Sequence, residues 1–223
     1  MHIRLAKPCD ATALARVYLL SATRLRHYFL PKLGFRFLRK YHEVLLSERN
    51  CVAVCLEDDA GEVVAFASGS LKAEEHMAAL ASRKLGLLWA SIPGLARKPT
   101  LLVGMRKRAR PVASHELHNG YIAATGPRLE FWGAANDSSN PAEVVALLNA
   151  WLKVSAECGA KQVQFEVDDE NVKVRRIHLA LGAHVVRSFQ TADGQPRTVM
   201  CYELSEMFRD TQSMRSGQHR SSV

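Results

Sequence analysis

The feature that most constrains the fold is a strand, a long amphipathic helix and a second strand between Arg128 and Val167. The apolar run "RLEFWGAA" (Arg128–Ala135) predicts the first strand. Asn140 is a good N-cap for the helix that follows, and Gly159 ends it. "KQVQFEV" (Lys161–Val167) alternates polar and apolar residues, which predicts a half-exposed strand. Two strands joined through a helix lie parallel in one sheet, so this unit predicts an α/β fold.

The remaining elements surround this unit in a defined order. Strand and helix patterns along the chain predict the order β-α-α-β-β-insertion-β-α-β-α-β-β. We therefore expect a mixed, twisted sheet of about six or seven strands flanked by helices. The further elements are a strand at His2–Ala6, helices at Asp10–Thr23 and Leu30–Ser47, a hairpin at Cys51–Ser70, a helix ending at Gly182, and two strands on either side of Ala192–Gly194.

The length of the chain, 223 residues, suits one main domain. We expect this domain to span residues 1–204, with a helical insertion at about 71–118 that has too few apolar residues to form a core alone. Residues 205–223 lack hydrophobic periodicity and predict a disordered tail.

The net charge of +8 is concentrated in the insertion. Arg83–Arg110 contains eight Lys and Arg residues and no acid, which leaves 30 − 8 = 22 bases against 22 acids elsewhere. This segment mixes cations with Leu, Ile and Trp89. It is compatible with contact to an anionic membrane surface, with an acidic ligand such as a nucleotide or lipid phosphate, or with a solvated basic face. We expect no nucleic-acid partner, because no aromatic residues are regularly interleaved with the cations.

Location is predicted from cysteines and hydropathy. The five cysteines include no CxxC pair, which is typical of reduced thiols in a cytoplasmic protein. Charged residues interrupt the N-terminal apolar runs, so we expect no signal peptide. The most apolar window, Leu85–Leu95, is about half the ~20 residues that span a bilayer, so we expect no transmembrane helix.

The stretch "ENVKVRRIHLALGA" contains a spaced motif. An Asn is followed by a small residue three positions on, an aliphatic residue six on, and an aliphatic residue and a Gly further along. The residues are Asn171, Val174, Ile177, His178, Leu181, Gly182 and Ala183. With the preceding strand "VQFEV", this pattern resembles the late motif of the GNAT (GCN5-related N-acetyltransferase) superfamily. The resemblance covers roughly residues 2–70 and 120–204, and it implies a GNAT-like fold.

The resemblance also implies a reaction, acyl transfer from acetyl-CoA or another acyl-CoA to a small amine such as an amino sugar or a biosynthetic intermediate. His178 stands where the superfamily has a Tyr that protonates the leaving thiolate, and an imidazole of ordinary pKa could serve as that acid. Glu130 is the first candidate for the general base. Alternation predicts that Leu129 and Phe131 both face away from it, and an ordinary solvent-facing role for Glu130 stays open.

The loop from Ala134 to Val145 is where the resemblance implies the CoA pyrophosphate. The superfamily turn is rich in glycine and carries a basic residue, whereas "NDSSNPAEVV" has neither. Pro141 removes one N–H donor, and the Glu143 carboxylate would repel phosphate. The implied cofactor-binding residues are Ala134, Ala135, Asn136, Ser138, Ser139, Asn140 and Asn171.

Two further sets of polar residues lie outside these motifs. His115, Glu116, His118 and Tyr121 resemble a metal motif but lack a third placed ligand, so a polar loop is preferred and no metal is expected. An acceptor-side contact or a second candidate base in this group stays open. Glu166 is a further acid beside the expected cleft, and a structural role is preferred for it. Three functions remain open: the N-acyltransferase, a non-catalytic GNAT-like binding or assembly module that has lost CoA binding, and a membrane-surface protein. Oligomeric state is not predicted.

Overall fold

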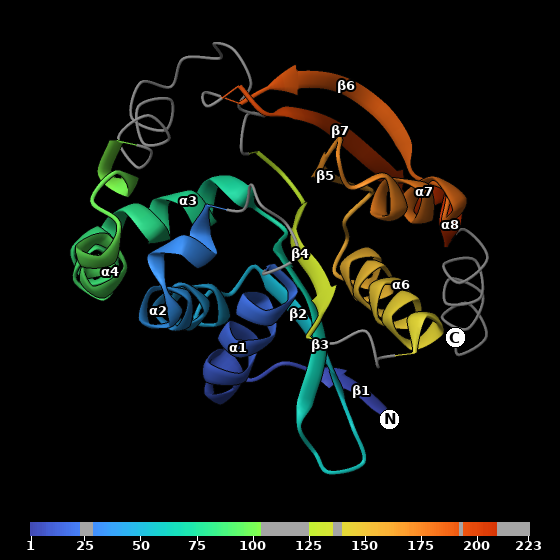
Figure 1. Ribbon diagram of the computed structural model, residues 1–223. Helices are drawn as coiled ribbons and strands as arrows, with labels where there is room; N and C mark the ends of the chain where they lie inside the picture. The colour runs from blue at the N-terminus through green and yellow to red at the C-terminus, as the bar shows by residue number, and fades with distance from the viewer. Residues whose placement is uncertain (23–28, 104–124, 136–139, 192–193, 209–223) are drawn as a thin grey trace.

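The protein folds around one seven-stranded mixed sheet, as the computed structural model shows (Figure 1). The structure describes residues 1–22, 29–103, 125–135, 140–191 and 194–208. The spatial order of the strands is β1-β2-β3-β4-β5-β7-β6. The strands are β1 His2–Leu5, β2 Cys51–Glu57, β3 Val63–Ser70, β4 Arg128–Ala134, β5 Gln162–Asp168, β6 His184–Gln190 and β7 Pro196–Glu203. The predicted α/β class and element order are confirmed.

The sheet contains a single parallel pair among its described strands. β4 and β5 run parallel, joined by the helix α6 (Pro141–Glu157), whereas every other neighbouring pair is antiparallel. This confirms the crossover predicted from Arg128 to Val167. The Asn140 side chain caps α6 by accepting a hydrogen bond from the backbone N–H of Ala142 over 3.0 Å. The start of α6 was therefore predictable from local sequence.

Helices cover the two faces of the sheet with separate cores. On one face, α6 buries Leu147, Leu148 and Trp151 against β2, β3, β5 and β7. On the other, α1 (Ala11–Ala22) and α2 (Phe35–Leu46) pack with Phe66 of β3 and Phe131 of β4. Figure 1 shows α1 and α2 on one side of β4 and α6 on the other.

Two predicted boundaries need correction. The sequence predicts one helix from Leu30 to Ser47, but a 3-10 turn (η2, Leu30–Leu33) is separated from α2 by Gly34 with φ +93°. A positive φ does not continue a right-handed helix, and glycine adopts it without strain. The sequence also predicts a disordered tail from Ser205, whereas α8 (Leu204–Met207) continues the ordered chain and buries Leu204.

The insertion begins directly after β3. Its described part contains α3 (Ala73–Ser82) and α4 (Lys84–Arg97). Partly buried leucines of α4 pack into the core between α1, α2 and the sheet. A buried chain of hydrogen bonds from His76 to Glu48 (2.8 Å) and Tyr41 (3.4 Å) fixes α3 to α2. In the described ranges, no helix combines the length and apolarity needed to cross a membrane.

Candidate active site between strands β4 and β5

The candidate site is an opening between the two parallel strands. In the described ranges, β4 and β5 pair at one position only, Arg128 opposite Gln164. Beyond that position the strands diverge, and a pocket lies between them. The helix α7 (Val172–Ala180), which follows β5, and its N-cap Asn171 supply the rest of the wall. The pocket is lined by Leu129, Glu130, Phe131, Trp132, Phe165, Glu166, Val167, Asn171, Val174 and His178.

A β-bulge at Glu130 accompanies this divergence. β4 pairs with β3 so that Phe131 lies opposite Ser68 and Leu129 lies opposite Gly69, leaving Glu130 as an extra residue. Leu129 therefore packs in the α6 core, while Phe131 packs in the α1–α2 core. The prediction that Leu129 and Phe131 share one face is wrong, because a bulge interrupts the two-residue alternation of the strand.

Close packing on the β3 side accompanies the bulge. A Cβ atom on Gly69 would lie 2.1 Å from the Arg128 carbonyl oxygen and 2.7 Å from the Trp151 ring. The β4 backbone thus approaches β3 at a point where only glycine leaves room. On the α6 side, the Trp132 indole N–H donates to the Val144 carbonyl over 2.8 Å and holds β4 against α6.

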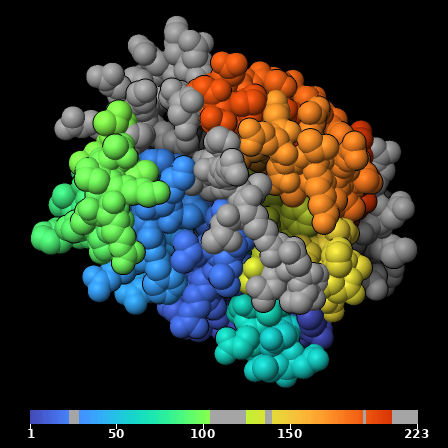
Figure 2. Space-filling model, in the orientation of Figure 1, coloured from blue at the N-terminus to red at the C-terminus, as the bar shows by residue number. Residues whose placement is uncertain are grey.

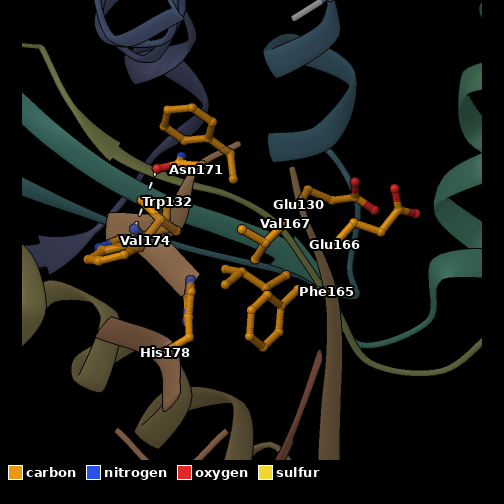
Figure 3. Close-up of a pocket in the computed structure, with 10 residues that line it drawn as sticks. Glu130, Trp132, Phe165, Glu166, Val167, Asn171, Val174 and His178 are labelled. Carbon is orange, nitrogen blue, oxygen red and sulfur yellow. Dashed lines mark hydrogen bonds between the residues drawn. The ribbon is translucent and has the colours of Figure 1, made fainter. Parts of the chain in front are cut away.

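Two carboxylates, Glu130 and Glu166, line one end of the pocket and belong to a charged network. Arg128 contacts Glu130 (Nε–Oε1 3.1 Å) and Glu166 (Nη2–Oε1 3.0 Å). Arg197 of β7 contacts Glu166 (3.0 Å) and Asp168 (2.7 Å). In these contacts three carboxylates share two guanidinium groups, and the five residues together carry a formal charge of −1. Figure 3 shows the carboxylates of Glu130 and Glu166 on the same side, away from His178.

His178 occupies the opposite, apolar end. Its ring packs against Phe165 with centroids 4.3 Å apart and edge-on to Trp132 at 5.2 Å. Its Nδ1 lies 2.7 Å from the hydroxyl oxygen of Tyr202 on β7. Burial lowers the pKa of His178 to about 4. The expectation of an imidazole with an ordinary pKa is therefore wrong, and the ring is neutral at pH 7 because the charged form would lose its hydration.

Burial also raises the pKa of Tyr202, so its phenol stays protonated at neutral pH. The His178–Tyr202 hydrogen bond is then a contact between two neutral groups. Where the Tyr202 O–H donates to Nδ1, the imidazole carries its proton on Nε2. In that tautomer His178 offers one N–H donor from the nitrogen that Tyr202 does not contact.

Asn171 caps the helix that carries His178. Its side-chain oxygen accepts a hydrogen bond from the Val174 N–H over 3.4 Å, and its own N–H donates to the Asp168 carbonyl over 2.8 Å. Asn171 lines the pocket wall, and its side-chain oxygen and backbone N–H serve the turn from β5 into α7. The structure therefore brings Glu130, Asn171 and His178 together around one pocket.

The described residues of the predicted phosphate turn, Ala134, Ala135 and Asn140, do not line this pocket. Ala135 is buried and its N–H donates to the Val64 carbonyl over 2.8 Å. In the first turn of α6, the Ala142 N–H goes to the Asn140 side chain, and those of Glu143 and Val144 go to the Asn140 carbonyl. Pro141 has no N–H. The described donors at this helix start are already used, and the predicted residues Asn136, Ser138 and Ser139 lie outside the described residues.

Sequence reasoning missed Arg128, Trp132, Arg197 and Tyr202. The sequence signal for the charged network is the alternation in β5. Its polar residues Gln164, Glu166 and Asp168 alternate with the buried residues Phe165 and Val167. Three polar residues on one face call for partners on the neighbouring strands. No local signal indicates Tyr202, because its pairing with His178 depends on how α7 packs over β7.

The polar group His115, Glu116, His118 and Tyr121 lies outside the described residues. Among the described residues, one group has ligand atoms within 4.8 Å of one another, His184, Cys201 and Glu203 on β6 and β7. None of these three lines the pocket. All five cysteines are free thiols.

Comparison with known proteins gives matches at the level of structure. No protein-family model matches the chain, and no curated protein matches it by sequence. A putative acetyltransferase from Salmonella typhimurium, solved with its cofactor acetyl-CoA, aligns at TM-score 0.56 and 14% identity, covering 92% of this chain and 94% of that one. A spermidine N-acetyltransferase from Vibrio cholerae aligns at TM-score 0.56 and 11% identity, covering 95% and 99%.

A third matching structure is described as a member of the GNAT family. A putative acetyltransferase of the GNAT family from Desulfovibrio desulfuricans aligns at TM-score 0.53 and 13% identity, covering 91% of this chain and 98% of that one. These alignments span nearly the whole of each chain. The chain therefore has the GNAT fold.

Proposed function

We propose that the protein is an acyl-CoA-dependent N-acyltransferase that acts on a small amine, such as an amino sugar or a biosynthetic intermediate. The observation that carries this proposal is the opening between β4 and β5, around which Glu130, Asn171 and His178 gather. Acetyl-CoA or another acyl-CoA is the co-substrate, with its thioester in this opening. Backbone N–H groups of β4 that point toward β5 would stabilise the charge that develops on the thioester oxygen.

The acidic end of the pocket suits an amine acceptor. An amine is mostly protonated at pH 7 and must lose a proton before it attacks the thioester. The network around Glu166 carries a formal charge of −1 and would attract the ammonium form. Glu130 would then accept the proton, directly or through one water molecule. Arg128, 3.1 Å from Glu130, holds that carboxylate in position.

His178 would act on the leaving group in this scheme. A neutral imidazole cannot supply an imidazolium proton, but its N–H can donate a hydrogen bond to the departing thiolate sulfur. Tyr202 would keep that N–H on the nitrogen it does not contact. His178 is thus proposed as a hydrogen-bond donor to the thiolate, in place of the acid of ordinary pKa that the sequence suggested.

A second function is favoured by the start of α6. Among the described residues, the backbone donors at the start of α6 are occupied by Asn140, and Pro141 offers none. A chain that keeps the fold and loses CoA affinity would serve as a non-catalytic binding or assembly module. The two functions differ in whether any acyl-CoA binds.

A calorimetric titration with acetyl-CoA, octanoyl-CoA and CoA separates them. The enzyme proposal expects a Kd below about 100 μM, or about −5.5 kcal/mol. Val174→Phe, which places a ring in the pocket, should weaken binding at least about 10-fold, or 1.4 kcal/mol. Val172→Phe is the matched control, because Val172 is exposed on the same helix and does not line the pocket. No heat with any of the three ligands would favour the module.

Turnover is then measured by thiol release with a panel of amines. Glu130→Gln removes the base and should lower kcat by about 100-fold or more while leaving acyl-CoA affinity unchanged. Glu206→Gln, on the exposed surface of α8, is the control. Equal turnover of Glu130→Gln and the parent protein would remove Glu130 from the base role.

A further inference from the structure

The helix α4 presents apolar side chains on two faces. Its inner face packs on the rest of the protein. Leu87 and Leu95 pack against the α1–α2 core, and Gly94 lies close to the backbone of Leu33. Its outer face remains exposed although it is also apolar. The exposed residues are Leu85, Leu88, Trp89 and Ile92.

These four residues form one continuous stripe. Their spacing of i, i+3, i+4 and i+7 places them on the same side of a helix. Trp89 is 74% exposed and Leu85 is 68% exposed. Single exposed apolar residues are ordinary, but a contiguous stripe that includes a tryptophan marks a surface that contacts something else.

Positive charge borders the stripe at both ends. Arg83 and Lys84 lie at the start of α4, and Arg97 and Lys98 at its end, all of them exposed. No acidic residue occurs between residues 83 and 110. The neighbouring η2 and α2 add exposed cations at Lys32, Arg36 and Arg39, of which Arg39 pairs with Glu43.

The stripe lies on an accessible edge of the molecule. In Figure 1, α4 lies on the far side of α2 from the sheet. In Figure 2, the light-green atoms of this part of the chain form the outer left surface. A flat external surface could therefore approach α4 without meeting the β4–β5 opening.

We propose that the outer face of α4 docks on the surface of an anionic lipid bilayer. Leu85, Leu88, Trp89 and Ile92 would enter the headgroup–acyl boundary, while the cations at the two ends of the helix contact lipid phosphates. The contact is interfacial, since an α4 of 14 residues is too short to span the hydrocarbon core.

A second copy of this chain fits the surface less well. In a two-fold dimer formed through α4, the cations at the ends of one helix would meet those of its partner, with no acid between residues 83 and 110 to pair with them. Anionic lipid supplies the missing negative charge. This inference concerns a separate surface and does not depend on acyl-CoA binding.

Vesicle flotation tests the proposal with the full chain. Vesicles of phosphatidylcholine alone are compared with vesicles containing phosphatidylglycerol, at low and high salt. We expect flotation with the anionic vesicles that weakens as salt screens the charges. Tryptophan emission should shift to shorter wavelength on binding. Trp89 is the exposed reporter, because Trp151 is fully buried and the Trp132 indole is bonded to Val144.

Variants locate the contact. Trp89→Glu with Ile92→Glu should reduce binding to anionic vesicles at least about 10-fold, and so should Arg97→Glu with Lys98→Glu. Val186→Glu is the matched control, because Val186 is similarly exposed on the edge strand β6. The substituted side chains are all exposed, so circular dichroism should match that of the parent protein.

Three results would overturn the proposal. These are no flotation with anionic vesicles, equal binding by the Trp89→Glu, Ile92→Glu variant, and equal loss of binding by Val186→Glu. Light scattering supplies a further outcome. A dimer that the Trp89→Glu, Ile92→Glu variant converts to a monomer would assign the face to a second copy of this chain.

Discussion

His178 and Tyr202 form a contact whose chemistry depends on burial. Their hydrogen bond of 2.7 Å joins a neutral imidazole and a neutral phenol at the apolar end of the pocket. An exposed histidine would change charge near pH 6.5, whereas the pKa of this one is lowered to about 4. An exposed and a buried histidine at this position would therefore give different profiles of reaction rate against pH.

The rate of acyl transfer should show no inflection from His178 between pH 6 and 8. Deprotonation of His178 is complete above about pH 5, so a loss of rate from this group should occur only near pH 4. Tyr202→Phe should lower kcat about 10-fold, the equivalent of a lost hydrogen bond, with little change in acyl-CoA affinity. A pH–rate profile and single-turnover kinetics measure this. If Tyr202→Phe lowered the stability of the protein and left kcat unchanged, Tyr202 would have only a structural role.

His42 provides a stability test at the same scale. It is fully buried among Tyr18, Tyr41 and Phe66, with ring centroids 5.3–5.8 Å away, and burial lowers its pKa to about 3. Neither ring nitrogen has a hydrogen-bond partner in the described structure. The unfolded chain therefore binds a proton below about pH 6.5 that the folded chain does not bind until about pH 3.

Because the unfolded state binds more protons in this interval, stability falls as the pH falls from about 6.5 toward 3. The slope from one such group is at most about 1.4 kcal/mol per pH unit. His42→Phe keeps an aromatic ring and removes the proton, so urea unfolding between pH 7 and 4.5 should give a flatter profile. His184→Phe, at an exposed position, is the control. An unchanged slope in His42→Phe would refute the assignment.

At the scale of elements, α4 contains two glycines in different surroundings. A Cβ on Gly94 would lie 2.4 Å from the Leu33 carbonyl oxygen, whereas a Cβ on Gly86 would lie 3.6 Å from the Lys40 side chain. The first distance is incompatible with the present packing, and the second is an ordinary contact. The two positions therefore form a matched pair on one helix.

Gly94→Ala should destabilise the protein by about 1–3 kcal/mol, because α4 must move away from η2. Gly86→Ala should be neutral or stabilising by up to about 1 kcal/mol, since alanine favours the helix. Urea denaturation measures both. Equal destabilisation by the two substitutions would show that α4 does not pack on η2 as described.

At the scale of the whole molecule, Trp151 joins the crossover helix to the hairpin. It is fully buried on α6, its indole N–H donates to the Val52 carbonyl over 2.8 Å, and its ring lies beneath Gly69 at the bulge. Trp151→Leu should cost about 3 kcal/mol or more, since it leaves a cavity and an unpaired carbonyl.

This loss should appear as one cooperative transition. Far-UV circular dichroism and tryptophan emission should give the same midpoint for Trp151→Leu, because the sheet and both cores unfold together. Trp132→Leu, at a partly buried pocket position, should cost less. Two separate transitions would mean that the two sides of the sheet are independent units.

The sequence by itself determined the order of the elements. Periodicity, the Asn140 cap and the Asn171–Gly182 spacing are local signals, and the structure places each in the predicted element. Glu130, Asn171 and His178 were also chosen from sequence, and they line one pocket. Local signals suffice here because caps and periodicity depend on residues only a few positions apart.

Only the tertiary structure decided which way the side chains face. The bulge at Glu130 follows from the register of β4 against β3, and it places Leu129 and Phe131 in different cores. The neutral state of His178 follows from burial beside Tyr202, 24 residues away in the chain. The exposed stripe of α4 follows from which of its two apolar faces packs on the core. Pairing register, burial and packing are set by contacts between distant residues, so no local pattern contains them.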